Sequence, residues 1–347
     1  MPAQPAHPEA PRAVILWLTT DQLALARQVC ALAQMRPVGA GSPQRGQGSA
    51  VAAELETRHL DDLRAALAGE EARLFWLLAP GAFGAGDSED AAALLAARAR
   101  GAIITSLEPI PAAATDLASG WLSQSGPLRP ADCAACGPRL RLSQPLRDAA
   151  EVLESFGDIR SAMVESWRRP SQGTLGAQVY DALDLLCALL GEPETVDAAY
   201  VGAGPGRARP PADSLRDFRG DLTASLRFAD GRTASVVASD HAGRWNRTVT
   251  LLGQRGRLRI FDDGFEWIDP AGEKVDASRR STREAPPKTT HDVAAMVDDI
   301  TRRLDPAIPP PGPVDHRTVM SLCQATLLSA RTGQCESPAS IRQMTGA

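Results

Sequence analysis

The chain has 347 residues, of which 44% are hydrophobic and 23% charged, and its formal net charge is −5. This composition is typical of a globular protein with a substantial core, and the length predicts two domains or one large one. The slightly acidic balance disfavours nucleic acid or a membrane surface as the main partner, and no apolar run approaches the roughly 20 residues of a membrane-spanning helix.

The N-terminus and the cysteines indicate the compartment of the protein and whether it binds a metal. Residues 1–12, MPAQPAHPEAPR, are rich in Pro and Ala without an apolar signal core, so we predict a disordered tail and a cytoplasmic protein. Among six cysteines only Cys133 and Cys136 form a CxxC. A zinc site would need a second pair or nearby histidines, which are not close in sequence. We therefore favour two free thiols in a loop and expect no metal, with metal or redox use of the pair as the alternative.

The first third of the chain alternates strand-like and helix-like segments. Continuous apolar runs predict buried strands, and apolar residues at helical spacing predict helices between them. The strands are expected at 13–19, 35–40, 72–80 and 101–105, and the helices at 21–34, 60–67 and 91–97. This order predicts a doubly wound α/β domain with a parallel sheet over residues 13–125, in which a helix ending at Trp121 precedes a Pro/Gly-rich loop at 125–137.

The remaining residues, 126–347, have a different order of predicted helices and strands. Helices are predicted at 145–157, 175–191, 290–303 and 315–332, and a strand at 160–167. Several strands follow one another between 195 and 268, with hairpin turns at Asp230-Gly231 and Arg255-Gly256. Consecutive strands joined by tight turns predict an α+β domain with a large, open and mostly antiparallel sheet.

A parallel N-terminal domain raises the question of a dinucleotide site. Such a site needs glycines in the turn after the first strand, so that backbone N–H groups can approach the pyrophosphate. Here the turn reads LTTDQ (18–22): it has no glycine, and the charge of Asp21 would repel a phosphate. Arg45, after the second predicted strand, could meet a 2′-phosphate, although a solvated arginine is the commoner interpretation. The single G-x-G, at 202–204, precedes a loop rather than a helix.

Several motifs in a fixed order resemble those of one enzyme family. They are LAP (78–80), TSLEPIP (105–111), LGAQVYDALDLLCALLGEP (175–193), the hairpin strands around Gly253 and Gly256, and SLCQATLLSARTGQ (321–334). Together the chain from Ala13 to Ile341 resembles the Gfo/Idh/MocA family of nicotinamide-dependent oxidoreductases. The resemblance implies an N-terminal Rossmann domain followed by a substrate domain whose open sheet often carries the oligomer interface. It also implies cofactor contacts at Thr19, Thr20, Ser42, Pro80 and Pro109.

The positions that carry catalysis in that family are changed here. In the family's E-K-P segment the lysine lies near the nicotinamide, but this chain has Leu107 and Glu108 before Pro109, which reverses the charge. In the long helix, the family aspartate falls on Ala177 and the proton-shuttling histidine on Asp181, whereas Asp184 matches a retained aspartate. Positions 177, 181 and 184 share one helix face, which the resemblance directs toward the cleft.

The candidate site residues are therefore Glu108, Asp181, Asp184 and His241, and each also has a structural interpretation. Glu108 could favour a helix N-terminus or pair with an arginine, and the two aspartates could simply pair with arginines. His241 stands near Arg244 and Trp245, a combination that suits an anion or sugar ligand and equally suits packing on a sheet.

The changed positions predict a family scaffold that has lost hydride transfer and acts as a noncatalytic binding or partner subunit without a cofactor. Its expected partners are a second copy or an active relative bound through the open sheet, or a small polar ligand. The alternative is a divergent dehydrogenase that uses NAD(H) or NADP(H), or a redox-neutral enzyme, acting on a sugar, polyol or related molecule. A small-molecule sensor is a third hypothesis. The sequence does not identify the ligand or the oligomeric state.

Overall fold

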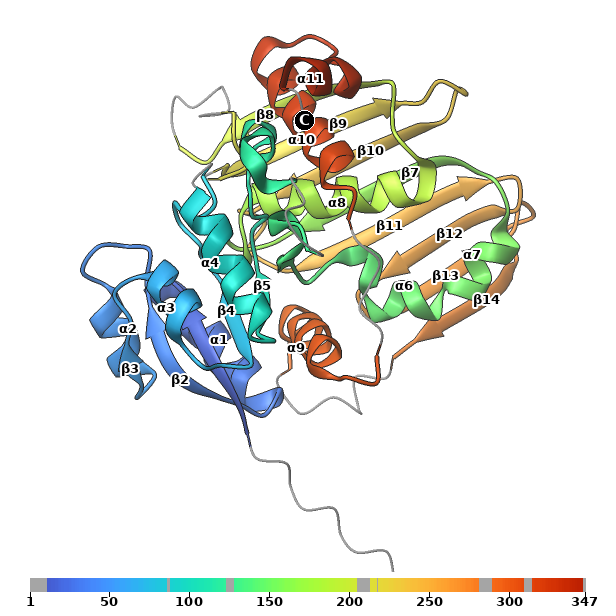
Figure 1. Cartoon of the computed structure of the whole chain (residues 1–347). Helices are drawn as coiled ribbons and strands as arrows, with labels where there is room; N and C mark the ends of the chain where they lie inside the picture. Colours follow the sequence, from blue (N-terminus) through green and yellow to red (C-terminus); the bar gives the residue numbers. More distant parts are fainter. Residues whose placement is uncertain are drawn as a thin grey trace, which may run out of the picture.

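Two sheets organise the chain in the computed structural model, which describes residues 11–85, 88–122, 128–204, 213–216, 218–280, 289–308 and 314–345. The N-terminal sheet has six strands and the second sheet has eight. Figure 1 shows the first sheet in the blue-to-cyan part of the chain and the second in the green-to-orange part. The predicted fold class, a Rossmann-like domain followed by a domain with a large open sheet, is confirmed. The predicted tail lies almost wholly outside the described residues.

The first sheet has the strand order β3-β2-β1-β4-β5-β6, and every neighbouring pair is parallel. Its strands are β1 (Arg12–Trp17), β2 (Met35–Gly41), β3 (Arg58–His59), β4 (Leu74–Leu77), β5 (Ile103–Ser106) and β6 (Ala134–Cys136). Helices α1 (Leu23–Leu32), α2 (Gly48–Glu54), α3 (Leu63–Gly69) and α4 (Ser88–Ala99) cover it. Because helices shield both faces, the central strands are continuously apolar, and residues 74–77 of β4 are all buried.

Three segments differ from the sequence-based prediction. The polar stretch after residue 41 contains α2 and β3, and the predicted loop 125–137 contains a short 3-10 turn, Pro130–Asp132, followed by β6. The helix expected before Trp121 is reduced to α5 (Ala114–Asp116) and a π turn, Leu117–Trp121. β6 has only three residues, so its identity depends on pairing with β5 rather than on any pattern of its own, and it carries the first sheet past residue 125.

The second sheet has the order β14-β13-β12-β11-β7-β10-β9-β8. Only β7 and β10 pair in parallel; all other neighbours are antiparallel. The strands are β7 (Ile159–Trp167), β8 (Thr195–Gly202), β9 (Gly220–Arg227), β10 (Thr233–Ser239), β11 (Asn246–Gly253), β12 (Gly256–Phe261), β13 (Gly264–Ile268) and β14 (Lys274–Arg279). Helices α6 (Gln144–Asp148), α7 (Ala150–Phe156) and α8 (Leu175–Leu190) cover one face (Figure 1). The single helix predicted at 145–157 is thus two short helices.

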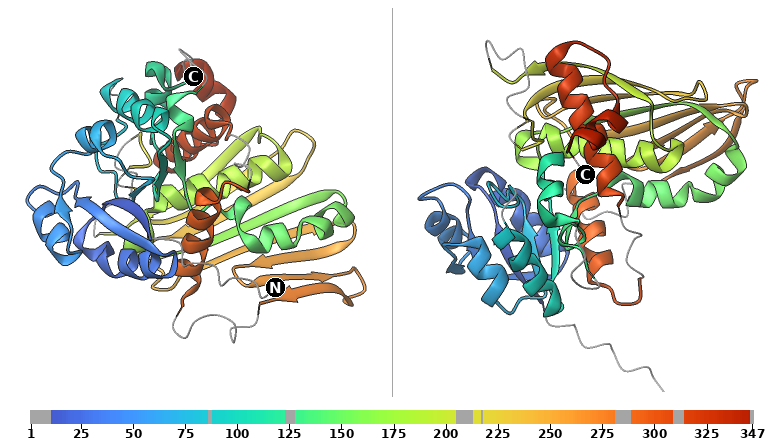
Figure 2. Two further views of the ribbon diagram at one scale, coloured as in Figure 1. Left: turned by 60° about the horizontal axis from the view of Figure 1, so that its bottom comes forward. Right: turned by 45° about the horizontal axis from the view of Figure 1, so that its top comes forward.

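The last helices tie the two domains together. α9 (His291–Leu304) packs its buried face on α1 of the N-terminal domain, and Figure 2 shows it between that domain and the large sheet. α10 (His316–Thr332) packs on α8 and β8, and α11 (Pro338–Thr345) follows it. The predicted helices at 290–303 and 315–332 correspond to α9 and α10, whereas β14 and α11 were not predicted. None of the helices that the structure describes is long and apolar enough to cross a membrane.

Candidate functional site

The turn after β1 is held by hydrogen bonds between its own residues. It forms a 3-10 turn, Thr20–Gln22, in which the Thr19 N–H donates to Oε1 of Gln22 at 3.1 Å. The Gln22 amide donates onward to the Leu78 carbonyl at the end of β4. Asp21 is exposed in the same turn and accepts from the Thr19 hydroxyl. The turn therefore presents a carboxylate, and one of its backbone donors is already occupied, so it does not fit a pyrophosphate.

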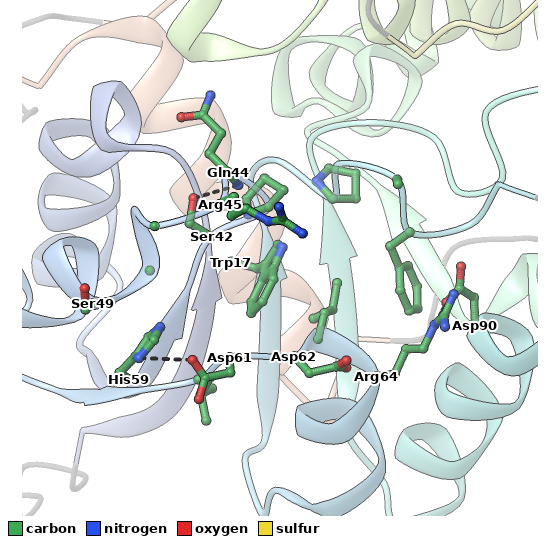
Figure 3. A pocket seen from close by; sticks show the side chains of 18 residues that line it. Trp17, Ser42, Gln44, Arg45, Ser49, His59, Asp61, Asp62, Arg64 and Asp90 are labelled. Atoms are coloured by element: carbon green, nitrogen blue, oxygen red, sulfur yellow. Dashed lines mark hydrogen bonds and ion pairs between the residues drawn. The ribbon is translucent and has the colours of Figure 1, made fainter.

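An open cavity of about 500 Å³ lies beside this turn, at the carboxyl ends of β1, β2 and β4. Ser42 and Arg45 line it from the segment after β2, and Pro80 lines it from the segment after β4. Figure 3 shows Trp17 at the centre of its wall, with Arg45 above the ring. Because parallel strands end at one edge, two of the residues expected to touch a cofactor, Ser42 and Pro80, meet here. Thr19, Thr20 and Pro109 do not line this cavity.

The lower rim of the cavity is rich in charge. His59 pairs with Asp61 at 3.4 Å, and Arg64 forms an ion pair with Asp90, whose side chain is buried (Figure 3). Asp90 also accepts the Gly84 N–H at 2.6 Å, which fixes the loop after β4. The rim is thus a rigid polar surface, suited to a small polar ligand or to the adenosine end of a nucleotide.

Trp17 is the last residue of β1, and its indole packs against the end of β2. A Cβ added at Gly41 would lie 2.1 Å from the Trp17 ring and 2.5 Å from the Leu60 carbonyl oxygen. The glycine at the end of β2 is therefore required by the indole and the neighbouring backbone, not by a ligand. The bulky ring narrows the crevice at the point where the strand order reverses, which is where ligands bind in open α/β sheets.

The TSLEPIP segment lies at the carboxyl end of β5. Leu107 is buried and belongs to one continuous apolar cluster with Leu78 and Trp245. Glu108 is half-buried, and its N–H donates to the Ser106 hydroxyl at 3.1 Å. Where the family resemblance implies a glutamate and a lysine, the structure thus has an apolar contact and a carboxylate.

Asp181 is enclosed in a buried ionic cluster between α8 and the large sheet. Its side chain accepts the Leu140 N–H at 2.6 Å and lies 3.4 Å from Arg168 and 3.9 Å from Arg247. Both arginines are 2% exposed, and both guanidinium groups lie over the Trp245 ring, at 4.4 and 4.9 Å from its centroid. Burial raises the pKa of Asp181, while Arg247 and Arg168 act in the opposite direction.

Asp184 lies one turn further along α8 and is also buried. It forms ion pairs with Arg141 at 3.0 Å and Arg139 at 3.8 Å. Burial raises its pKa, and the two arginines counteract that rise. Both aspartates therefore pair with arginines in the folded chain, which is the structural interpretation given to them from the sequence.

His241 does not join the aspartates of α8. It follows β10, is exposed, and pairs through Nδ1 with the buried Asp240. Asp240 in turn accepts the Gly220 N–H at 2.9 Å and lies 3.5 Å from Arg219. His241 thus belongs to a loop-fixing network at the end of the sheet.

The cysteine pair and possible metal ligands complete the survey. Cys133 and Cys136 are free thiols on either end of β6, and burial raises their pKa to about 11 and about 12. Protonated thiols are poor nucleophiles and poor metal ligands. Within the part of the chain that the structure describes, no group of three or more His, Cys, Asp or Glu side chains is arranged to bind a metal ion.

The two domains contact each other at the turn that follows β1. The 3-10 turn at Thr20–Gln22 contacts a second one, Pro170–Gln172, which follows β7. The Gln172 amide donates to Asp292 at the start of α9 at 2.5 Å. This junction was not predicted from the sequence, because its parts come from distant segments without a shared motif. Arg168, Arg247 and Trp245 lie behind the junction.

Comparison with known proteins supports the fold assignment. No model of a known protein family matches the chain, and no curated protein is similar to it in sequence. Among solved structures, levoglucosan dehydrogenase in complex with NADH and levoglucosan has a TM-score of 0.64 at 15% identity, over 94% of this chain and 98% of that one. An oxidoreductase from Agrobacterium radiobacter in complex with NAD+, L-tartaric acid and magnesium has a TM-score of 0.63 at 15% identity, over 95% and 99%. GenD2 from gentamicin A biosynthesis, in complex with NAD, has a TM-score of 0.63 at 15% identity, over 97% and 99%.

These similarities extend over nearly the whole length of both chains in each comparison. The chain therefore has the two-domain fold of Gfo/Idh/MocA-type oxidoreductases, as its motifs predicted. At 15% identity the likeness establishes the fold, and the activity has to be argued from the site.

Proposed function

We propose that this protein is a noncatalytic member of the dehydrogenase fold that acts as a binding or partner subunit. The observation that carries the proposal is the state of Asp181, which occupies the expected place of the proton-shuttling histidine. It is 4% exposed and surrounded by Arg168, Arg247 and the Leu140 N–H. A group enclosed in this way is not within reach of a substrate hydroxyl, which general acid–base catalysis requires.

The charge at the end of β5 supports the same conclusion. Hydride loss from an alcohol is helped by a nearby cation, which stabilises the developing alkoxide. Glu108 presents a carboxylate instead, and Leu107 extends the apolar cluster that includes Trp245. The turn after β1 adds the charge of Asp21 where a pyrophosphate would need donors. Asp181, Glu108 and the turn after β1 are therefore all unsuited to hydride transfer.

A turnover assay tests this part of the proposal. The purified chain is incubated with NAD+ or NADP+ and with levoglucosan, L-sorbose, L-tartaric acid and a panel of polyols, and reduced nicotinamide is followed by absorbance. Levoglucosan dehydrogenase, which has a similar fold, is the positive control. We expect no reduction above the blank. Turnover that scales with the concentration of this chain would overturn the proposal.

The open face of the large sheet supports a role in assembly. On the face opposite the helices, Met163, Trp167, Val201 and Leu252 are 44%, 38%, 64% and 46% exposed. Met163 lies on β7 and Leu252 on the adjacent β11, near the centre of the sheet. Val201 lies on the edge strand β8, three strands from Met163, so the four side chains are spread over the open face rather than gathered in one patch. An interface over this face would cover all four. We propose that a second copy, or an active relative, binds here.

Light scattering on two matched variants tests this surface. Met163→Glu places a charge in the middle of the open face, whereas Met344→Glu changes a methionine on α11 that is 69% exposed. We expect the wild type and Met344→Glu to form the same oligomer, and Met163→Glu to shift to monomer. A monomeric wild type across the accessible concentrations, alone and mixed with an active relative, would contradict the assembly role.

A second candidate function rests on the open cavity. Ser42, Arg45 and Pro80 line about 500 Å³ at the edge where the adenosine half of a dinucleotide binds in this fold. A divergent dehydrogenase could hold NAD(H) or NADP(H) by that half alone and use Glu108 as a base. Turnover in the assay above, lost in Glu108→Gln, would favour this alternative.

A further inference from the structure

A second cavity, of about 570 Å³, lies on the outer side of the edge strand β6. Its walls come from β5 and β6, from the 3-10 turn Pro130–Asp132, from Tyr180 on α8, and from the end of α9 and the start of α10. It shares no residue with the cavity around Trp17. Cys133 and Cys136, the CxxC of the sequence, line it, but that motif did not indicate a cavity, and the proposed function does not use it.

The lining of this edge-strand cavity carries an excess of positive charge. Five arginines and three aspartates line it: Arg73, Arg98, Arg139, Arg302 and Arg303, with Asp132, Asp299 and Asp305. Asp299 pairs with Arg303 of the same lining at 2.7 Å, and Asp132 pairs at 2.6 Å with Arg129, which lies outside the lining. Arg73, Arg98, Arg139 and Arg302 then remain against Asp305. Arg302, at the end of α9, makes no hydrogen bond or ion pair with a described residue. The net positive charge of the lining therefore favours the binding of an anionic ligand.

Arg139 is the buried part of this positive lining. It is 6% exposed, yet its Nε and Nη1 have no hydrogen-bond partner among the described residues. The Asp184 carboxylate lies 3.8 Å from Nη1, which is too long for a hydrogen bond. Arg139 thus has Asp184 as a counter-ion but two buried nitrogens without a hydrogen bond, so an anion that approaches this guanidinium from the cavity gains more than it would at an exposed arginine.

The rest of the lining defines the body of the ligand. Ile104, Leu142 and Val314 supply apolar surface. The Tyr180 hydroxyl is hydrogen-bonded to Nδ1 of His316 at 3.1 Å, and Nε2 of His316 lies 3.4 Å from Asp132, so these polar groups already satisfy one another. The cavity thus combines a cationic wall with an apolar one.

We propose that the edge-strand cavity binds a small organic anion. Its carboxylate or phosphate group faces Arg139 and Arg302, and its apolar body lies against Ile104 and Leu142. Cavities of this size with a few convergent polar groups are the usual form of small-molecule sites.

Calorimetric titration of the full chain tests the site with three probes. Benzoate and phenyl phosphate carry the two anionic head groups on the same ring, and benzamide is the neutral analogue. We expect at least one anion to saturate below about 10 mM and benzamide not to, because the head group supplies the interaction with the arginines. The comparison between the two anions identifies the preferred head group.

Titration of three variants tests whether the anion binds in this cavity. Arg302→Gln removes a half-buried cation without a described partner, and we expect affinity to fall roughly tenfold. Arg36→Gln, an exposed arginine on β2, is the matched control and should bind as the wild type does. Arg139→Met should abolish binding where it folds; if it does not fold, Arg302→Gln decides. Equal binding of benzamide, no saturation by either anion, or equal affinity of Arg302→Gln and the control would each overturn the proposal.

Discussion

Replacing Asp181 by asparagine separates a structural role from a catalytic one. The substitution keeps the size of the side chain and an oxygen for the Leu140 N–H, so the main change is the loss of negative charge beside Arg168 and Arg247. At distances of 3.4 and 3.9 Å each ion pair has a gross energy of about 4–5 kcal/mol at an effective dielectric constant near 20. Desolvation of the carboxylate offsets part of this, and removing one partner of a buried ion pair typically costs about 3–5 kcal/mol. We therefore expect the free energy of unfolding to fall by about 3 kcal/mol.

Urea unfolding followed by tryptophan fluorescence measures this loss. Asp197→Asn is the matched control, because Asp197 is exposed on β8 and a surface substitution of this kind changes stability by at most about 0.5 kcal/mol. If Asp181→Asn were as stable as Asp197→Asn, the carboxylate would not be the counter-ion of the two arginines. Asp181 would then be available to exchange a proton, and the reasoning behind the proposed loss of catalysis would be refuted.

Three further predictions concern other buried or titrating groups. Asp90→Ala should lower the free energy of unfolding by about 2–4 kcal/mol in the same assay, since it leaves the buried Gly84 N–H without its acceptor and removes one of the two carboxylates, Asp90 and Glu89, that pair with Arg64; a loss below about 0.5 kcal/mol would contradict this role. Hydrogen bonds from His316 and Arg129 outweigh burial and lower the pKa of Asp132 to about 2, so its contribution to stability is present above about pH 4 and is lost as the pH falls toward 2. The melting temperature of Asp132→Asn should therefore fall less steeply than that of the wild type between these pH values, and parallel curves would refute the assignment. Iodoacetamide at about pH 8 should label native Cys335, which is exposed, and should leave Cys133 and Cys136 unmodified because their pKa is raised to about 11 and about 12; labelled peptides from either would contradict this.

Elements with a strong local signal were predictable from the sequence. α8 was expected at 175–191 and occupies Leu175–Leu190, because a long apolar-periodic segment begins after a capping threonine and ends before glycine. The resemblance, and not the pattern of elements, selected Ser42 and Pro80, and both line one cavity because the carboxyl ends of parallel strands lie at one edge of the sheet.

Features that depend on long-range pairing were not predictable. β6 has only three residues and is a strand because it pairs with β5. The cluster around Asp181 draws Arg168, Trp245 and Arg247 from two strand ends, and nothing in the spacing of these residues indicates that they meet. His241 was grouped with the aspartates because its residue type suits acid–base chemistry, but the loop after β10 directs it to Asp240 instead.

The most direct test of the central claim is titration of the purified protein with NADH and NADPH, followed by nicotinamide fluorescence. The structure places Asp21 in the turn after β1, Leu107 in the same apolar cluster as Trp245, and the 3-10 turn Thr20–Gln22 against the turn Pro170–Gln172 of the second domain. We predict no saturable change in nicotinamide fluorescence up to about 1 mM of either cofactor, a concentration at which even a weak site of about 4 kcal/mol would be half occupied. Saturable binding in the micromolar range, with enhanced nicotinamide fluorescence, would contradict the account and identify the chain as a cofactor-dependent enzyme.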